Sequence, residues 1–127
     1  MGKMIAGYRK TVLGLAAMAS LLSAAPARAS NEGDMTFYYN YVVSYTKSAI
    51  ADIQHAETLN TIQEQCSYLR KADGELKEAD RFAVKLTNVD QYYNSINYSL
   101  YVRVLGDLSS IEGELGTMLR QCAAQDF

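Results

Sequence analysis

The chain has few of the residues from which catalytic and metal sites are usually built. Its 127 residues include one histidine, two cysteines, no tryptophan and one proline. A zinc site takes three or four ligands, mostly from Cys and His, so these residues are too few for an all-protein metal site. Neither a C-x-x-C-H haem motif nor a G-x-S-x-G nucleophile motif occurs. We therefore expect no metal, no other cofactor and no enzymatic activity.

The histidine and the carboxylates have simpler explanations than catalysis. His55 follows Asp52 by three residues, but one histidine and one carboxylate do not make a metal site, and His55 lies opposite the apolar stripe of its helix. The acidic residues of 73–80 and those at Glu112 and Glu114 could suggest a pair for glycoside hydrolysis. Because lysines and arginines are interspersed through 70–85, we interpret the first group as a solvated helix surface.

A basic character is also absent. Twelve Lys and Arg residues against 14 Asp and Glu residues give a formal net charge of −2, which disfavours nucleic-acid binding. Apolar residues make up 49% of the chain and charged ones 20%, a composition typical of a folded protein rather than a disordered one. The length suits one ordinary domain.

The first 29 residues have the order of a bacterial secretory signal. A basic segment, 1–10, precedes an apolar run over 11–25, and Pro26 then leads to the small-residue pattern Ala-Arg-Ala at 27–29. A membrane anchor is the alternative, but an apolar run of about 15 residues is shorter than the ~20 that span a bilayer. We predict that 1–29 is a cleaved signal peptide, that 30–127 is a single helical domain, and that the protein is periplasmic or secreted.

Removal of this signal makes the chain more acidic. The segment 1–29 carries four basic residues and no acidic one, so 30–127 keeps eight basic and fourteen acidic residues, a net charge of −6. Such a chain is repelled by nucleic acid and by anionic lipid, and no later segment is apolar for long enough to insert into a membrane. A charged partner would therefore be a basic protein.

The two cysteines, Cys66 and Cys122, are predicted to form a disulfide, because export leads to an oxidising compartment. A crosslink over this separation stabilises by roughly 4 kcal/mol in the chain-entropy model. The alternative, a reactive thiol, has no C-x-x-C motif to support it.

Apolar residues spaced by three and four predict helices throughout 34–122. The first helix is expected to start after a cap at Asp34 and to end near Glu57, and the second to follow a cap at Asn60. The dipeptide at 73–74, Asp-Gly, reads as a turn, followed by a short helix over 76–86.

The segment from a cap at Asn88 to Cys122 can be read in two ways. Its apolar stripe is continuous in phase, which favours one helix. With a turn at 73–74, however, one unbroken helix would carry Cys122 tens of ångströms from Cys66 by the ~1.5 Å rise per residue. We therefore expect a reversal at 106–107. The predicted fold is all-α, a small antiparallel bundle of four or five helices with one internal disulfide.

Tyrosine is the abundant residue, with ten in the chain, mostly in two clusters near 38–45 and 92–101. Phe37 and Tyr41 fall outside the apolar arc of the first helix and are predicted to form an exposed protein-binding pair. A second candidate is the stripe Tyr98, Val102 and Leu105, although a neighbouring helix in a five-helix arrangement would cover it.

These features predict an exported, non-catalytic helical protein that binds another protein, as an inhibitor, an immunity protein or an accessory subunit of an envelope assembly. The alternative is a periplasmic stress chaperone activated by acid. Acidification neutralises fourteen carboxylates while the basic side chains keep their charge, so the net charge would change from negative to strongly positive.

Overall fold

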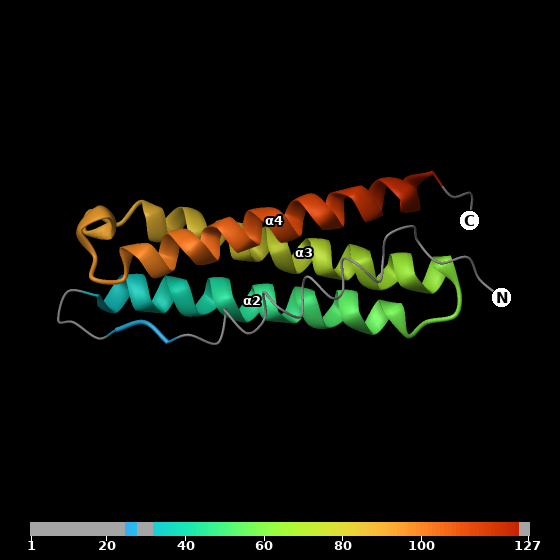
Figure 1. Ribbon diagram of the computed structural model, residues 1–127, viewed down its shortest axis with the longest axis horizontal. Helices are drawn as coiled ribbons and strands as arrows, with labels where there is room; N and C mark the ends of the chain where they lie inside the picture. Colours follow the sequence, from blue (N-terminus) through green and yellow to red (C-terminus); the bar gives the residue numbers. More distant parts are fainter. Residues whose placement is uncertain (1–24, 28–31, 125–127) are drawn as a thin grey trace.

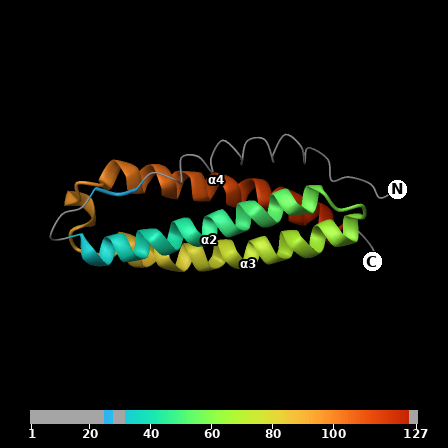
Figure 2. The same cartoon turned by 90° about the horizontal axis from the view of Figure 1, so that it is seen from below.

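The computed structural model describes residues 25–27 and 32–124, which contain three long helices and one short 3₁₀ helix. They are α2 (Gly33–Glu57), α3 (Ile62–Thr87), η1 (Tyr92–Asn94) and α4 (Tyr98–Ala123). The long helices run side by side along the molecule, with α3 antiparallel to both neighbours (Figure 1). Helices α2 and α3 pack along their length and α4 lies over the pair (Figure 2).

The all-α prediction is confirmed, but the number of helices is wrong, because the described part of the chain has three rather than four or five. The predicted signal and its cleavage site lie outside the described residues, apart from 25–27. Within the described ranges, no helix combines the length and the apolar character needed to cross a membrane.

Helix α2 follows its predicted pattern and ends at Glu57 as expected. Every residue assigned to its apolar stripe is buried: Met35, Tyr39, Val42, Thr46, Ala49, Ile50 and Ile53. Thr46 is accommodated in this core because its hydroxyl donates a 2.6 Å hydrogen bond to the Val42 carbonyl. The predicted cap at Asp34 is wrong by two residues, since Glu32 occupies the N-cap position and Asp34 lies in the first turn.

Helix α3 begins one residue later than predicted, and its capping chemistry differs. Thr61, not Asn60, is the N-cap, and its hydroxyl oxygen accepts a 3.1 Å hydrogen bond from the Glu64 N–H. The hydroxyl also donates to Glu64 Oε1 at 2.8 Å.

The predicted turn at 73–74 is absent, because α3 continues through it. Asp73 forms an ion pair with Lys77 one turn later at 3.0 Å, and Gly74 faces open space. An exposed glycine inside a helix costs only about 1 kcal/mol. The unbroken stripe, which buries Cys66, Leu69, Ala72, Leu76, Ala79, Phe82 and Leu86, outweighs that cost.

Helix α4 is likewise continuous through Gly106, so the predicted reversal at 106–107 is also wrong. One stripe of buried residues runs along its whole length: Tyr101, Val104, Leu108, Ile111, Leu115, Met118 and Cys122. The chain reverses instead over 88–97, where Asn88 ends α3 rather than starting the next helix.

The single reversal at 88–97 explains the disulfide. Cys66 lies near the start of α3 and Cys122 near the end of α4, so two uninterrupted antiparallel helices place them at the same level. The Cys66–Cys122 bond is present, with a Cα–Cα distance of 5.8 Å, and the predicted pairing is confirmed.

Candidate protein-binding surfaces

The predicted pair on α2 forms part of an aromatic patch, which we define as Phe37, Tyr38, Tyr41, Tyr45 and Phe82. Phe37 is 54% exposed and Tyr41 39%, so both reach the surface outside the core stripe. The Phe37 ring meets the Tyr41 ring edge-on, with centroids 4.9 Å apart. Tyr41 in turn stacks on Phe82 of α3, with centroids 4.5 Å apart and planes 12° apart. The patch therefore bridges α2 and α3.

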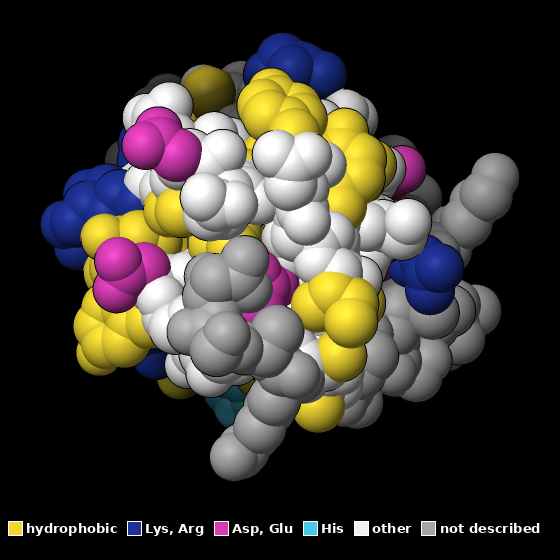
Figure 3. All heavy atoms as spheres, turned by 90° about the vertical axis from the view of Figure 1, so that its left-hand side faces the viewer, with side chains coloured by type: hydrophobic (Ala, Val, Ile, Leu, Met, Phe, Trp, Pro, Cys, Tyr) yellow, Lys and Arg dark blue, Asp and Glu magenta, His cyan; other side chains and the backbone are white. Residues whose placement is uncertain are grey.

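Two cations border this patch. Arg81 lies over the Phe82 ring, with Cζ 4.9 Å from the centroid, and Lys85 Nζ lies 5.4 Å from it. Arg81 is also paired with Glu78 at 2.6 Å. Although the chain is acidic overall, the rim of the aromatic patch is therefore cationic. Figure 3 looks along the bundle at the end where α2 begins and α3 ends, and it shows hydrophobic side chains at several separate places on that surface.

The sequence did not indicate Phe82 as a member of the patch. Its spacing along α3 assigns it to the core, and it is indeed almost fully covered. Part of that cover comes from Tyr41 and Tyr45, whose centroids lie 4.5 and 6.0 Å from the Phe82 centroid. Only the pairing of α2 with α3 brings these rings together, so no local signal could have shown it.

The second predicted stripe lies on α4, along a different side of α3. Tyr98 is 36% exposed, Val102 45% exposed and Leu105 partly buried. In the described ranges no further long helix lies over this stripe: Tyr98 contacts the rings of Tyr92 and Tyr93 in η1, and Leu105 faces α3. Val84 of α3, which is 59% exposed, adds apolar surface across from Leu105.

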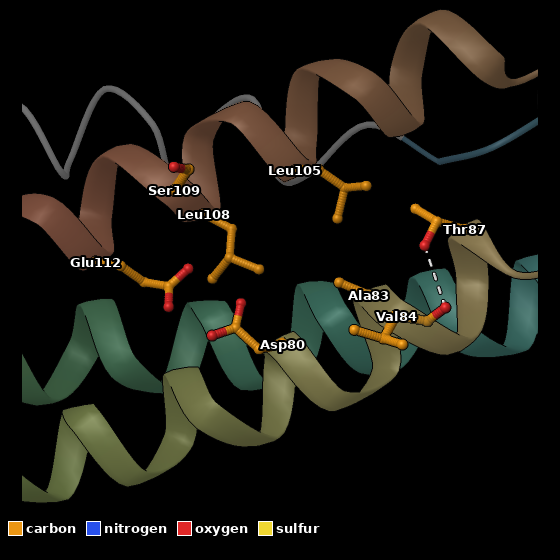
Figure 4. A pocket seen from close by; sticks show the side chains of 8 residues that line it. All are labelled: Asp80, Ala83, Val84, Thr87, Leu105, Leu108, Ser109 and Glu112. Atoms are coloured by element: carbon orange, nitrogen blue, oxygen red, sulfur yellow. Dashed lines mark hydrogen bonds between the residues drawn. The ribbon is translucent and has the colours of Figure 1, made fainter.

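A pocket of about 360 Å³ lies between α3 and α4 beside this stripe (Figure 4). We call it the α3–α4 groove. Its walls are Asp80, Ala83, Val84 and Thr87 from α3 and Leu105, Leu108, Ser109 and Glu112 from α4. Figure 4 shows apolar side chains at one end and, at the other, the carboxyl groups of Asp80 and Glu112 pointing toward one another.

The carboxyl groups of Asp80 and Glu112 face each other across the interface between α3 and α4. Burial raises the pKa of Glu112 to about 8, and the adjacent Asp80 carboxyl group and the negative charges of Asp80 and Asp73 act in the same direction. Glu112 therefore keeps a proton to a higher pH than an ordinary glutamate.

A similar pair, Asp52 and Glu75, joins α2 to α3. Burial raises the pKa of Glu75 to about 7; the hydrogen bond to Asp52 and its charge add to the shift, and Lys71 opposes it. Asp52 Oδ2 and Glu75 Oε1 are buried and receive no hydrogen bond from an N–H or hydroxyl donor. Lys71 Nζ lies 3.5 Å from Asp52 Oδ1, so it compensates only part of the negative charge.

A buried polar network that the sequence did not reveal lies where α2 begins. The Glu32 side chain is 1% exposed and accepts hydrogen bonds from the Ser95 hydroxyl and, at 3.0 Å, from Asn97 Nδ2. Asn97 also exchanges two 2.7 Å hydrogen bonds with the backbone of Ala27. Burial raises the pKa of Tyr101, and the negative charge of the Glu32 carboxylate adds to this shift. Glu32 thus ties α2 to the 88–97 loop.

His55 and Asp52 do not converge on a common site. The His55 ring meets Tyr68 edge-on at 4.5 Å, whereas Asp52 faces Lys71 and Glu75. Across 25–27 and 32–124, no group of three His, Cys, Asp or Glu side chains is placed to hold a metal ion.

Comparison of the chain with known protein families, with curated proteins and with solved structures finds no match. The functional interpretation therefore depends on the surfaces described above.

Proposed function

We propose that this is an exported, non-catalytic helical protein that binds another protein through the aromatic patch. The observation that carries the proposal is the position of Phe37. This large aromatic side chain is more than half exposed and lies against two other rings, while the buried stripe of α2 is complete without it.

The patch has the properties of a binding surface. Aromatic side chains are enriched at interfaces and dominate their binding energy, because they bury a large area at a small cost in side-chain entropy. Tyr41 is already held by its stacking on Phe82, so little of its freedom remains to be lost on binding. Arg81 and Lys85 at the rim can pair with carboxylates of the partner.

Export is supported by the pattern of 1–29 and by the Cys66–Cys122 disulfide, since such crosslinks persist in oxidising compartments. A small stapled bundle without enzymatic activity suits an inhibitor, an immunity protein or an accessory subunit of an envelope assembly. Intact-mass measurement of the exported product tests this part, with Ser30 expected as its first residue. Retention of 1–29 in a membrane fraction would contradict export.

The carboxyl pairs weigh against the alternative of an acid-activated chaperone. A chaperone that acid activates by opening its bundle needs helix contacts that weaken as pH falls. Glu75 and Glu112 have pKa values raised to about 7 and about 8, so their protonation between pH 8 and pH 5 removes repulsion inside the bundle. Mild acidification should tighten these helix contacts.

Capture of partners from an envelope extract at pH 7 and pH 3 separates the two functions. Under our proposal the oxidised protein retains one partner at pH 7, and Phe37→Ser loses it. Tyr93→Ser is the matched control, because Tyr93 is highly exposed but contacts Tyr92 and Tyr98 rather than the patch. Binding of many proteins only at pH 3 would contradict the proposal and favour a chaperone.

A further inference from the structure

The α3–α4 groove combines features that the aromatic patch lacks. Its apolar part is formed by Val84 of α3 and by Leu105 and Leu108 of α4, and this surface continues along α4 to the exposed Val102. At its other end lie Asp80 and Glu112. The groove therefore presents an apolar strip that ends at an acidic pair.

The acidic pair is only partly compensated within the chain. Both groups that act on the Glu112 carboxyl from α3, Asp80 and Asp73, are acidic. Lys77 is one turn from Asp73 and forms its ion pair there, at 3.0 Å. A cationic group placed between Asp80 and Glu112 would replace the proton on Glu112 and offset the negative charge of both carboxylates.

The shape and charge of the groove favour one kind of occupant. A small amine would meet the carboxyl pair but leave Val84 and Val102 uncovered. A second copy of this chain would bring further negative charge, since the chain is acidic and becomes more so if 1–29 is removed. An amphipathic helix covers an elongated apolar strip with residues at i, i+3 and i+4, and a lysine or arginine on it can reach the acidic end.

We infer that the α3–α4 groove binds an amphipathic helix of a partner protein, with apolar side chains on Val84, Leu105 and Val102 and one Lys or Arg between Asp80 and Glu112. This assigns the basic partner expected from the net charge to the groove, whereas the aromatic patch has a cationic rim. The inference depends on the proposed function only in assuming a protein partner.

Selection from a displayed library of short helical peptides, with the oxidised protein as bait, tests the inference. The expected consensus has one Lys or Arg flanked by apolar residues at three- and four-residue spacing. Binding of the best peptide should weaken about tenfold or more when its basic residue is replaced by glutamine. Val84→Glu should abolish binding, whereas Phe37→Ser, which changes the aromatic patch on α2, should leave it unchanged.

The pH dependence gives a second readout. Because the cation displaces a proton, affinity should rise from about pH 6 to about pH 9. Glu112→Gln removes the titrating carboxyl group and its negative charge, so its affinity should be low and nearly independent of pH. This variant also removes the repulsion between the carboxylates, and its unchanged or raised melting temperature would show that it is folded.

Three results would overturn the inference: no enriched peptide, a consensus without a basic residue, or binding insensitive to Val84→Glu. Self-association abolished by Val84→Glu would also overturn it, because the occupant would then be a second copy. Each of these results leaves the aromatic patch untouched, since that surface is tested with different residues and with the natural partner.

Discussion

Tyr41 of α2 lies nearly parallel to Phe82 of α3, with ring centroids 4.5 Å apart, and thereby covers a side chain of the core from the outside. Among the residues that the structure describes, Phe37, one turn earlier, meets only the rings of Tyr38 and Tyr41 on its own helix. The two predicted binding residues are therefore not equivalent. Phe37 is surface, whereas Tyr41 belongs partly to the surface and partly to the packing between α2 and α3.

This difference predicts different effects on stability. Phe37→Ser should change the free energy of unfolding by no more than about 0.5 kcal/mol, as exposed substitutions usually do. Tyr41→Ser should lower it by about 1–2 kcal/mol, because it removes the stacking on Phe82 and exposes that ring. Urea denaturation of both variants measures the two changes in the free energy of unfolding. Equal losses of several kcal/mol would show that Phe37 belongs to the core.

Reduction of the disulfide should lower the free energy of unfolding by roughly 4 kcal/mol, because the bond closes a long loop in the unfolded chain. Cys66→Ala/Cys122→Ala should reproduce the effect without reductant. Non-reducing mass spectrometry should show a monomer lighter than the reduced chain by two hydrogens. A disulfide-linked dimer would contradict the antiparallel arrangement of α3 and α4.

The Asp52–Glu75 pair predicts that the free energy of unfolding falls as pH rises from 5 to 8. The pKa of Glu75 is raised to about 7, above its ordinary value, so its contribution is fully present at low pH and is lost as pH rises through 7. Between pH 5 and pH 8 this loss should be on the order of 1–2 kcal/mol, less than the full shift implies, because the side chain is partly exposed.

Glu75→Gln should flatten this part of the pH profile and should be at least as stable as the wild type at pH 8. Glu78→Gln is the control, since Glu78 is exposed and paired with Arg81, and it should keep the wild-type profile. Chemical denaturation at several pH values measures the free energy of unfolding of the wild type and of both variants. A Glu75→Gln profile as steep as that of the wild type would show that Glu75 is not the source of this pH dependence.

Replacement of the buried Glu32 should loosen the end of the bundle. Glu32→Ala leaves the buried Ser95 hydroxyl without its acceptor and removes one of the two acceptors of Asn97 Nδ2, which should cost about 1–3 kcal/mol. Asp90→Ala, an exposed change in the same loop, should cost little. Hydrogen exchange should show lost protection at 95–101 in the first variant only. Protection equal to that of the wild type would contradict the role of Glu32 as a tie.

The sequence predicted α2 almost completely, because its apolar stripe, its length and its end agree with one another. The sequence-based prediction was wrong where a local turn signal conflicted with a continuous apolar stripe. The Asp-Gly pair at 73–74 is a strong turn signal, but the cost of one exposed glycine is smaller than the gain from continuous burial between Leu69 and Leu76.

The error at 73–74 produced the error at 106–107. A turn after a short second helix would have separated Cys66 from Cys122, so a second reversal was needed to join them. The apolar stripe of this segment is continuous in phase, and it correctly predicts one helix, because the buried residues from Tyr101 to Cys122 face one core without a break. One reversal at 88–97 satisfies both the stripe and the disulfide.

Other parts of the candidate sites could not be predicted from a single sequence. Phe37 and Tyr41 were identified because their angular position on one helix is a local property. Phe82 under Tyr41, and the carboxyl pairs across helix interfaces, depend on how the helices dock. The sequence therefore assigns Glu75 to a solvated helix surface and gives no sign that Glu112 faces Asp80 of α3.

Site-specific photocrosslinking in the cell tests the proposed binding surface most directly. A photoreactive phenylalanine analogue at position 37 should crosslink to one partner protein, because the side chain is expected to lie within the interface. The same analogue at position 51, where the exposed Ala51 lies about four turns further along α2, should give no such product. Crosslinking from position 51 but not from 37, or identical products from both, would contradict binding through the aromatic patch.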